Sequence, residues 1–161
     1  MKPGVPQLVD FGGDDREQAF DLLREGFPSM PARVWQRGFE RLAASPPPGG
    51  SGRLGQLLLI DGVPAGLVLE IASERDAGAM PRAIVNLSSW YVRPQARANA
   101  LWMLKALTRR ADVTYTDLSA TAGVARMLPV LGFETISHQI LCMPLVKLAR
   151  RASTSARVLD E

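Results

Sequence analysis

The segment from Ala83 to Leu107 constrains the fold of this chain more than any other. Pro94 divides it, because proline has no amide hydrogen and cannot continue a strand ladder. From about Gln95 to Arg110, apolar residues recur at helical spacing, so a helix is predicted there. The part before Pro94 is rich in strand-favouring side chains, namely Ile84, Val85, Trp90, Tyr91 and Val92. The segment therefore predicts a strand–turn–helix unit, with any ligand held at its turn.

Basic residues gather in the sequence around this turn. They are Arg93, Arg97, Lys105, Arg109 and Arg110, in a chain whose formal net charge is +3. Local positive charge favours an anionic ligand such as a phosphate, although a solvated face would have the same composition. Nucleic-acid binding would need a basic stripe with interleaved aromatic residues, which the sequence lacks.

The first part of the chain predicts one strand and two helices. The strand is Leu8 to Phe11. The first helix is predicted to begin at an N-cap, Asp14, with Glu17 three residues later at the spacing of a capping box, and Pro28 ends it. A second helix is predicted from Pro31, with a buried stripe formed by Val34, Trp35, Gly38, Phe39 and Leu42. The run from Ser45 to Gly52 is rich in proline and glycine and predicts a loop.

A hairpin comes next, from Gln56–Ile60 to Ala65–Ile71, and it turns at Asp61-Gly62. The polar residues Ser73 to Pro81 predict a loop. The remaining elements are a strand at Val113–Leu118, a helix from Gly123 to Leu131 that stops at Gly132, and a strand region from Thr135 to Leu145. This order predicts an α/β (α+β) protein whose mixed sheet is covered by helices on both faces.

Length, cysteine content and hydropathy narrow the class of protein. The 161 residues suit one domain, and 47% of them are apolar. No apolar run reaches the roughly 18 residues that span a membrane, and the N-terminus does not resemble a secretory signal. The single cysteine, Cys142, excludes an internal disulfide and favours a reducing compartment, so a cytoplasmic location is predicted.

Common catalytic and metal-binding patterns are missing. His138 and Cys142 would lie about 13 Å apart on one strand, too far to share a proton. One histidine and one cysteine cannot form a metal cluster, so no metal is expected. The sequence also lacks a Walker loop and a G-x-G-x-x-G motif.

Three local patterns, in this order of elements, resemble the GNAT superfamily of N-acyltransferases, which use acetyl-CoA. They are the hairpin Leu57–Leu69 turning at Asp61-Gly62, the run from Trp90 to Arg97, and Leu131-Gly132-Phe133. The middle run is similar to the family's Val-x-Pro-x-x-Arg. Together the patterns span Leu8 to Leu145. The resemblance implies a GNAT-like, mostly antiparallel central sheet in one domain over 1–146, followed by a basic tail over 147–161.

The resemblance also implies an acyl-CoA co-substrate held at the turn. The backbone of Tyr91 and Val92 would meet pantetheine, while a pyrophosphate would lie at the helix N-terminus. The implied phosphate-end residues are Arg97, Ala98, Asn99, Ala100, Leu101 and Trp102. This chain departs from the family because no glycine lies between Gly78 and Gly123, and because Trp102 stands where a small residue is usual. The indole would either block the co-substrate or pack beneath it.

The catalytic residues of the family are only partly matched. Leu128 stands where many members have a tyrosine that acts as general acid, and Thr121 corresponds to an asparagine found before it. Many members use a glutamate base near the middle strands, and Glu70 and Asp117 are the candidates here. A backbone N–H on a splayed strand could stabilise the oxyanion without a side chain.

The sequence is compatible with two functions. The first is transfer of an acetyl group from acetyl-CoA, or another acyl group from its CoA thioester, to the amine of a small molecule or a protein. The second is a GNAT-like binding or assembly module that has lost catalysis. Pro94 and Arg97 favour the enzyme, whereas Trp102 and Leu128 favour the module. No membrane or nucleic-acid partner is expected, and a homodimer is common among proteins of this resemblance.

Overall fold

A computed structural model describes residues 4–13, 15–44, 52–76 and 81–137. It divides into two compact units, one running to Ala122 and one starting at Gly123. The predicted boundary between a 1–146 domain and a 147–161 tail lies outside the described residues and stays a prediction.

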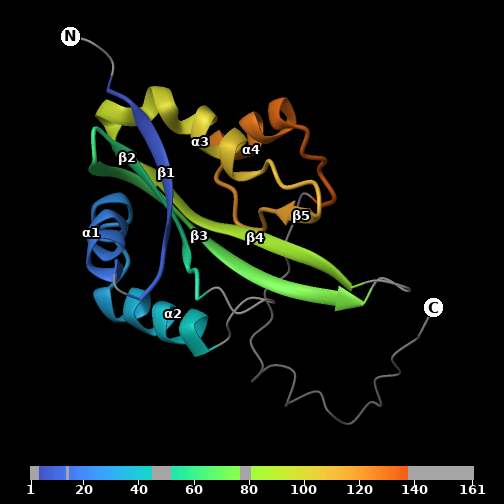
Figure 1. Cartoon of the computed structure of the whole chain (residues 1–161), viewed down its shortest axis with the longest axis horizontal. Helices are drawn as coiled ribbons and strands as arrows, with labels where there is room; N and C mark the ends of the chain where they lie inside the picture. The colour runs from blue at the N-terminus through green and yellow to red at the C-terminus, as the bar shows by residue number, and fades with distance from the viewer. Residues whose placement is uncertain (1–3, 14, 45–51, 77–80, 138–161) are drawn as a thin grey trace. The chain divides into compact units, whose positions relative to one another are not determined.

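The first unit is built on one mixed five-stranded sheet (Figure 1). Its strands are β1 (Pro6–Phe11), β2 (Gly55–Ile60), β3 (Val63–Asp76), β4 (Pro81–Val92) and β5 (Val113–Thr116). They lie side by side in chain order. The first three pairings are antiparallel and the last, between β4 and β5, is parallel. The predicted mixed, mostly antiparallel sheet is therefore confirmed.

The turn between β2 and β3 confirms the hairpin read from the sequence. Asp61 has a φ of 51° and Gly62 a φ of 78°. Two successive positive φ angles are what a two-residue hairpin with the right-handed strand twist requires. Asp61 adds a tie to the start of the sheet, because its Oδ1 accepts a hydrogen bond of 3.0 Å from the N–H of Val5.

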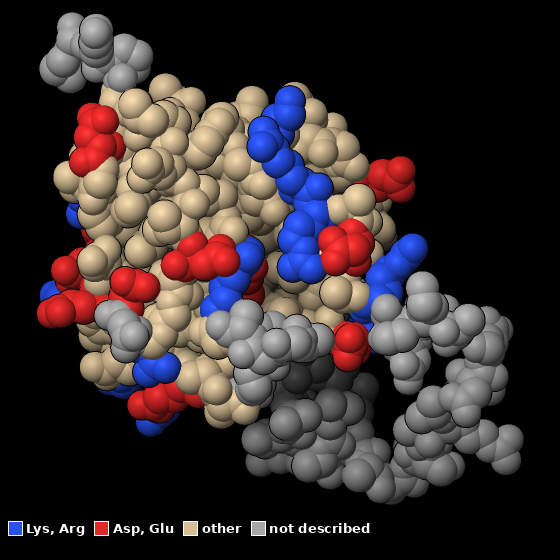
Figure 2. Space-filling view, viewed as in Figure 1, with Lys and Arg blue, Asp and Glu red and all other residues tan. Residues whose placement is uncertain are grey.

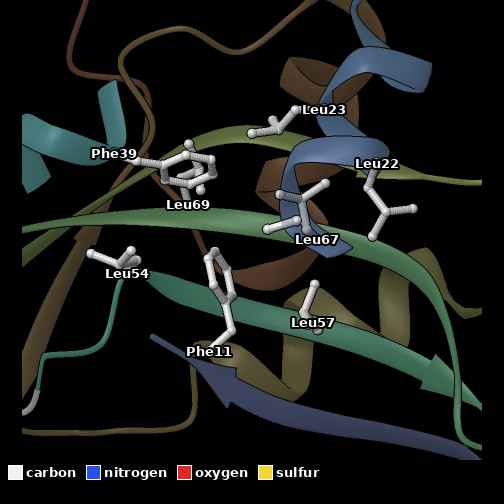
Figure 3. Close-up of a cluster of buried hydrophobic side chains, with 9 residues drawn as sticks. Phe11, Leu22, Leu23, Phe39, Leu54, Leu57, Leu67 and Leu69 are labelled. Atoms are coloured by element: carbon white, nitrogen blue, oxygen red, sulfur yellow. The ribbon is translucent and has the colours of Figure 1, made fainter. Parts of the chain in front are cut away.

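Helices α1 (Arg16–Gly26) and α2 (Ala32–Ala44) cover one face of this sheet. Figure 3 shows how α1, α2 and the strands meet in one apolar cluster. The alternation of side chains along a strand puts every second strand residue into this cluster. Its members are Phe11, Ala19, Leu22, Leu23, Phe39, Leu54, Leu57, Leu67 and Leu69.

The N-terminus of α1 differs from the prediction. Asp15 is the N-cap residue and makes no side-chain capping bond. The predicted cap, Asp14, lies outside the described residues. In α2 only Phe39 of the predicted stripe is fully buried, so the stripe is not simply a core face.

Helix α3 (Ala100–Leu107) covers the other face. It buries Met103, Leu104 and Leu107, none of which belongs to the cluster under α1 and α2. Leu58 and Val68 are also buried, and each lies next to a strand residue that points to the α1 side. The prediction of helices on both faces is confirmed.

The loop predicted from Ser73 to Pro81 was wrong at both of its ends, because Ser73–Asp76 belong to β3 and Pro81 begins β4, while 77–80 lie outside the described residues. Cross-strand pairing continues outward from Ser73↔Ile84 to Asp76↔Pro81. Polar side chains are compatible with a strand here because this end of the hairpin extends beyond β2, which begins opposite Leu69 at Gly55.

The helix predicted from about Gln95 to Arg110 is confirmed in its central part, but its first turn and its bounds differ from the prediction. Residues Pro94–Asn99 form a 3₁₀-helix (η1), and the α-helix runs only from Ala100 to Leu107. The N–H of Ala96 bonds the carbonyl of Arg93, and the N–H of Ala100 bonds that of Arg97. These i→i+3 bonds tighten the turn and use amides that an α-helical start would leave unpaired.

In the second unit, α4 (Ala122–Met127) leads into a short 3₁₀-helix, η2 (Leu128–Leu131). Gly132 follows with a φ of 85° and donates its N–H to the carbonyls of Leu128 and Pro129. The predicted stop at Gly132 is confirmed, since glycine readily adopts this left-handed conformation. The strand predicted from Thr135 to Leu145 lies mostly outside the described residues.

Candidate functional site

Strands β4 and β5 separate part-way along the sheet. Their pairing ends at Asn86↔Thr116, whereas β4 continues to Val92. The Asn86 carboxamide fixes this point, because its Oδ1 accepts hydrogen bonds of 3.2 Å from Thr116 Oγ1 and from the N–H of Leu118. Beyond it, no strand of the described residues pairs with the outer edge of β4. This backbone edge can accept an extended ligand.

The same stretch of β4 carries a bulge. From Leu67↔Tyr91 to Leu69↔Ser88, two steps on β3 match three steps on β4, so β4 holds one extra residue. Ser89 has a φ of 53°, a conformation that costs a non-glycine residue roughly 1–3 kcal/mol. A bulge turns backbone groups away from the ladder, which makes an N–H available to a ligand.

A cavity of about 410 Å³ lies against this bulge. Its volume is within the roughly 300–1,000 Å³ of small-molecule sites. Ser88 and Ser89 line it from β4, and their hydroxyl oxygens lie 3.3 Å apart. Helix α2 contributes most of the apolar wall with Val34, Trp35, Gly38, Phe39 and Leu42. The stripe predicted as core therefore has two roles, because Trp35, Phe39 and Leu42 also belong to or pack against the core cluster.

Glu70 is the acidic residue of the cavity wall. Its side chain is 8% exposed, and both carboxylate oxygens lie 2.5 Å from Arg53 Nη2. Arg53 also reaches Asp10, with 3.1 Å between Nη1 and Oδ1. Burial raises the pKa of Glu70, and Arg53 opposes that shift only in part. The result is a buried carboxylate with a raised pKa beside the cavity, a group that can accept a proton from a bound ligand.

The other two candidate catalytic residues do not line this cavity. Asp117 Oδ1 accepts a hydrogen bond of 3.0 Å from the N–H of Ser119, so its carboxylate closes the turn after β5. Burial raises the pKa of Asp117, while N–H bonds from Ser119 and Ala120 oppose the shift. Thr121 is exposed immediately before α4.

The predicted phosphate-end residues lie on η1 and the first turn of α3. Arg97 and Ala98 are exposed, and Asn99 and Ala100 are half-buried. Asn99 Nδ2 donates to the carbonyl of Ala96 over 3.4 Å, so the carboxamide is turned toward its own segment. The structure brings these residues together on the surface, with the N–H groups of Ala96 and Ala100 already bonded within the turn.

Trp102 and Leu101 stand on the surface of α3, with exposed fractions of 39% and 43%. The indole therefore does not pack into the core beneath the turn. Removing it should change the surface of the turn more than the packing of the unit.

Tyr91 and Arg93 tie the end of β4 to α1. Tyr91 Oη donates to Glu25 Oε1 over 2.9 Å, and Arg93 Nε donates to Glu25 Oε2 over 2.8 Å. The Tyr91 ring also packs on Phe27, with 6.5 Å between ring centroids. Burial would raise the pKa of Glu25, but the bonds from Arg93 and Tyr91 outweigh it and lower that pKa. The Tyr91 side chain is thus a packing residue, which leaves its backbone for any ligand contact.

The overall arrangement matches acetyltransferases of known structure. A predicted acetyltransferase with acetyl-CoA from Clostridium acetobutylicum superposes with a TM-score of 0.65, at 12% identity, over 89% of this chain and 98% of that one. An acetyltransferase of Trypanosoma brucei gives 0.62, at 13% identity, over 87% and 100%. The aminoglycoside acetyltransferase AAC(6')-Iy, in complex with a bisubstrate analog, gives 0.61, at 19% identity, over 87% and 98%. The fold is that of the GNAT superfamily.

At the level of sequence, no protein-family model matches the chain, and neither does any curated protein. The GNAT fold is therefore carried here by a sequence far from the relatives with solved structures. The fold is shared with these solved structures, whereas the identity of 12–19% carries no argument about the side chains of the cavity.

Sequence reasoning missed Arg53 and the role of α2. Arg53 follows a Pro/Gly-rich run and has no periodic pattern around it, so no local signal could connect it with Glu70. In the α2 stripe, Gly38 could have indicated this role, because glycine lowers the stability of a helix interior and its presence there suggests a packing or functional requirement. Apart from the chain neighbours and the backbone of α2 itself, no heavy atom of the described residues lies within 4 Å of the place that a Cβ of residue 38 would take, so Gly38 leaves part of the cavity empty.

The surface charge, helix hydropathy and possible metal ligands of the described residues bear on what the chain can bind. Acidic and basic side chains are mixed over the face shown in Figure 2, rather than gathered into one basic surface. Within the described ranges no helix is long and apolar enough to cross a bilayer, and no three potential metal-ligand side chains come together.

Proposed function

We propose that this chain is an acyl-CoA-dependent N-acyltransferase that moves an acetyl group from acetyl-CoA to an amine. The observation that carries the proposal is the separation of β4 from β5 beside a bulge and a cavity. An extended pantetheine chain would pair with the free edge of β4 near Tyr91 and Val92. The thioester would then reach the bulge, and the acceptor amine would enter from the cavity. Solved structures with this fold hold CoA or acetyl-CoA, which supports the same co-substrate here.

The chemistry asks for three things of the protein. The thioester carbonyl must be polarised, which a backbone N–H freed by the bulge can do. The amine must lose a proton, and Glu70 is the carboxylate on the cavity wall. The departing thiolate must be stabilised or protonated. We assign Glu70 as the proton acceptor, directly or through water. Asp117 and Thr121, which lie between β5 and α4, are given no catalytic role.

Arg97 is the residue that we assign to the pyrophosphate. The 3₁₀ bonds of η1 engage amides at this turn, so the guanidinium has to supply much of the attraction. A phosphate contact of this kind weakens as salt is raised.

Calorimetric titration with CoA and acetyl-CoA tests the proposal. We expect binding that weakens at least about tenfold in Arg97→Ala, which corresponds to a loss of about 1.4 kcal/mol. Arg109→Ala is the matched control, because it removes the same charge beyond the end of α3. If millimolar CoA produces no heat and no thermal shift, the proposal is wrong.

Acetyl transfer provides the second test. Glu70→Gln should lower kcat by about 100-fold or more, the usual contribution of a general base, while CoA affinity stays unchanged. In the wild type, the rate should rise with pH through the raised pKa of Glu70, because only the ionised carboxylate accepts a proton.

The runner-up is a non-catalytic GNAT-like module. The tight η1 turn and the exposed Trp102 favour it, because a surface aromatic beside a closed turn suits a protein contact. CoA binding without thiol release for any amine would support the module. Whichever of the two functions holds, we expect the chain to act in a reducing, cytoplasmic compartment, with no bound metal.

A further inference from the structure

The walls of the cavity differ sharply in their chemistry. Its larger apolar side chains come from α2 and β3, namely Val34, Trp35, Phe39, Leu42, Leu69 and Ile71. Two of them are aromatic, and Trp35 packs on Phe27 with 5.4 Å between ring centroids. Such a surface gains free energy by burying an apolar ligand and gains none from a hydrated polar one.

The charged side chains of the cavity wall favour an acceptor that carries few ammonium groups. They are Arg41, Arg53 and Glu70, so cations outnumber carboxylates. The Glu70 carboxylate already has Arg53 on both oxygens. An acceptor with several ammonium groups would therefore meet two guanidinium groups and a carboxylate that is already paired. Like charges at close range in a partly dehydrated site repel strongly.

We propose that the acceptor is a monoamine with an apolar body, aromatic or branched aliphatic, and that amines with several positive charges are rejected. This inference rests on the proposed function. The apolar body lies between α2 and β3, and the single amine is directed to the bulge at Ser88 and Ser89. The free space over Gly38 is where the body of the acceptor fits.

The proposal separates this chain from relatives with the same fold that act on amino sugars. AAC(6')-Iy was solved with a bisubstrate analog built on neamine, a sugar with several amines. Fold likeness alone would suggest the same acceptor here. The cavity wall argues against it, because one paired carboxylate cannot balance several ammonium groups.

The test uses the full chain and two probe amines, 2-phenylethylamine and neamine. Each is titrated by calorimetry with and without CoA, and transfer from acetyl-CoA is followed by thiol release. We expect 2-phenylethylamine to bind at least about tenfold more tightly than neamine and to be the better acceptor, a difference of about 1.4 kcal/mol. Equal or tighter binding of neamine, or no binding of either amine, would overturn the proposal.

A pair of variants locates the binding. Gly38→Leu fills the space over α2 and should weaken 2-phenylethylamine at least about tenfold, with CoA affinity unchanged. Gln36→Leu is the matched control, since residue 36 is exposed on the same helix and does not line the cavity. Gly38→Ala checks that substitution at this position keeps the fold. If Gly38→Leu binds the amine as the wild type does, the cavity is not the acceptor site.

Failure of this inference and failure of the proposed function give different results. CoA binding with transfer to neamine leaves the acyltransferase standing and overturns the acceptor class. Binding of 2-phenylethylamine that depends on residue 38, without any CoA binding, supports the apolar amine site and overturns acyl transfer.

Discussion

At the scale of single residues, the pair of Glu70 and Arg53 is the most consequential feature. A buried carboxylate is costly unless a cation and hydrogen bonds compensate it. Arg53 supplies both, and reaches Asp10 on β1 as well. The pair therefore joins the loop before β2 to β3 at the cavity wall, where stability and the proposed chemistry depend on the same carboxylate.

Removing the cation should expose the cost of the carboxylate. We expect Arg53→Met to lower the free energy of unfolding by roughly 3–5 kcal/mol at neutral pH, because Glu70 stays buried without its partner. The double variant Arg53→Met/Glu70→Leu should recover most of the loss. Urea unfolding of the wild type, both single variants and the double variant measures this.

The pH dependence of that variant gives an independent check. The folded pKa of Glu70 is raised, so its contribution to stability is full below its ordinary value of 4.5 and is lost as pH rises through the folded value. Arg53→Met should raise that pKa further. The deficit of the variant should therefore shrink in acid, and a deficit that is constant from pH 4 to 8 would contradict the assignment.

Glu25 should behave in the opposite sense. Its folded pKa is lowered by Arg93 and Tyr91, so its contribution is present above 4.5 and is lost as pH falls through the folded value. The group is partly exposed, so solvent screening keeps the effect below about 1 kcal/mol. Glu25→Gln should be less stable than the wild type at pH 7 and equal to it at strongly acidic pH, as judged by urea midpoints.

At the scale of elements, two glycines have opposite meanings. A Cβ on Gly55, in β2, would overlap the carbonyl oxygen of Val68 and approach the Phe11 ring. Strands β2 and β3 can lie so close there only because that residue has no side chain. Gly38, in α2, faces empty space instead.

The two alanine substitutions should therefore differ in sign. We expect Gly55→Ala to cost about 3 kcal/mol through overpacking. Gly38→Ala should stabilise the fold by up to about 1 kcal/mol, the difference in helix propensity. Thermal unfolding measures both, and equal effects at the two positions would show that the packing around Gly55 is wrong.

At the scale of the whole molecule, stability is concentrated in the inner strands. Leu57, Leu58, Leu67 and Val68 on β2 and β3 are almost completely buried, and both strands are paired on two sides. Among the described strands, β5 is a four-residue edge strand whose side chains are half-buried or exposed. The separation of β4 from β5 lies at this weaker edge, which is where a ligand can enter at low cost.

Hydrogen exchange should follow this gradient. We expect the slowest amides in β2 and β3 and much faster exchange in β5, because edge pairing opens without global unfolding. Binding of CoA should slow exchange in β5 and at the free edge of β4 more than elsewhere. Protection of β5 equal to that of β3 before ligand is added would contradict the gradient.

The sequence by itself determined the fold class and most of the helices and strands. Alternating and helical apolar patterns, Asp61-Gly62, Pro94 and Gly132 are local signals, and each punctuates the chain as predicted. The sequence also placed Arg97 on the turn and Glu70 on the inner strand of the hairpin.

Only the tertiary structure decided what those elements do together. The bulge at Ser89, the pairing of Arg53 with Glu70, and the use of α2 as a cavity wall all depend on contacts between distant segments. A periodic pattern reports which face of a helix avoids water. It does not report whether that face meets a packed core or an unfilled cavity, because the difference lies in the residues brought opposite it.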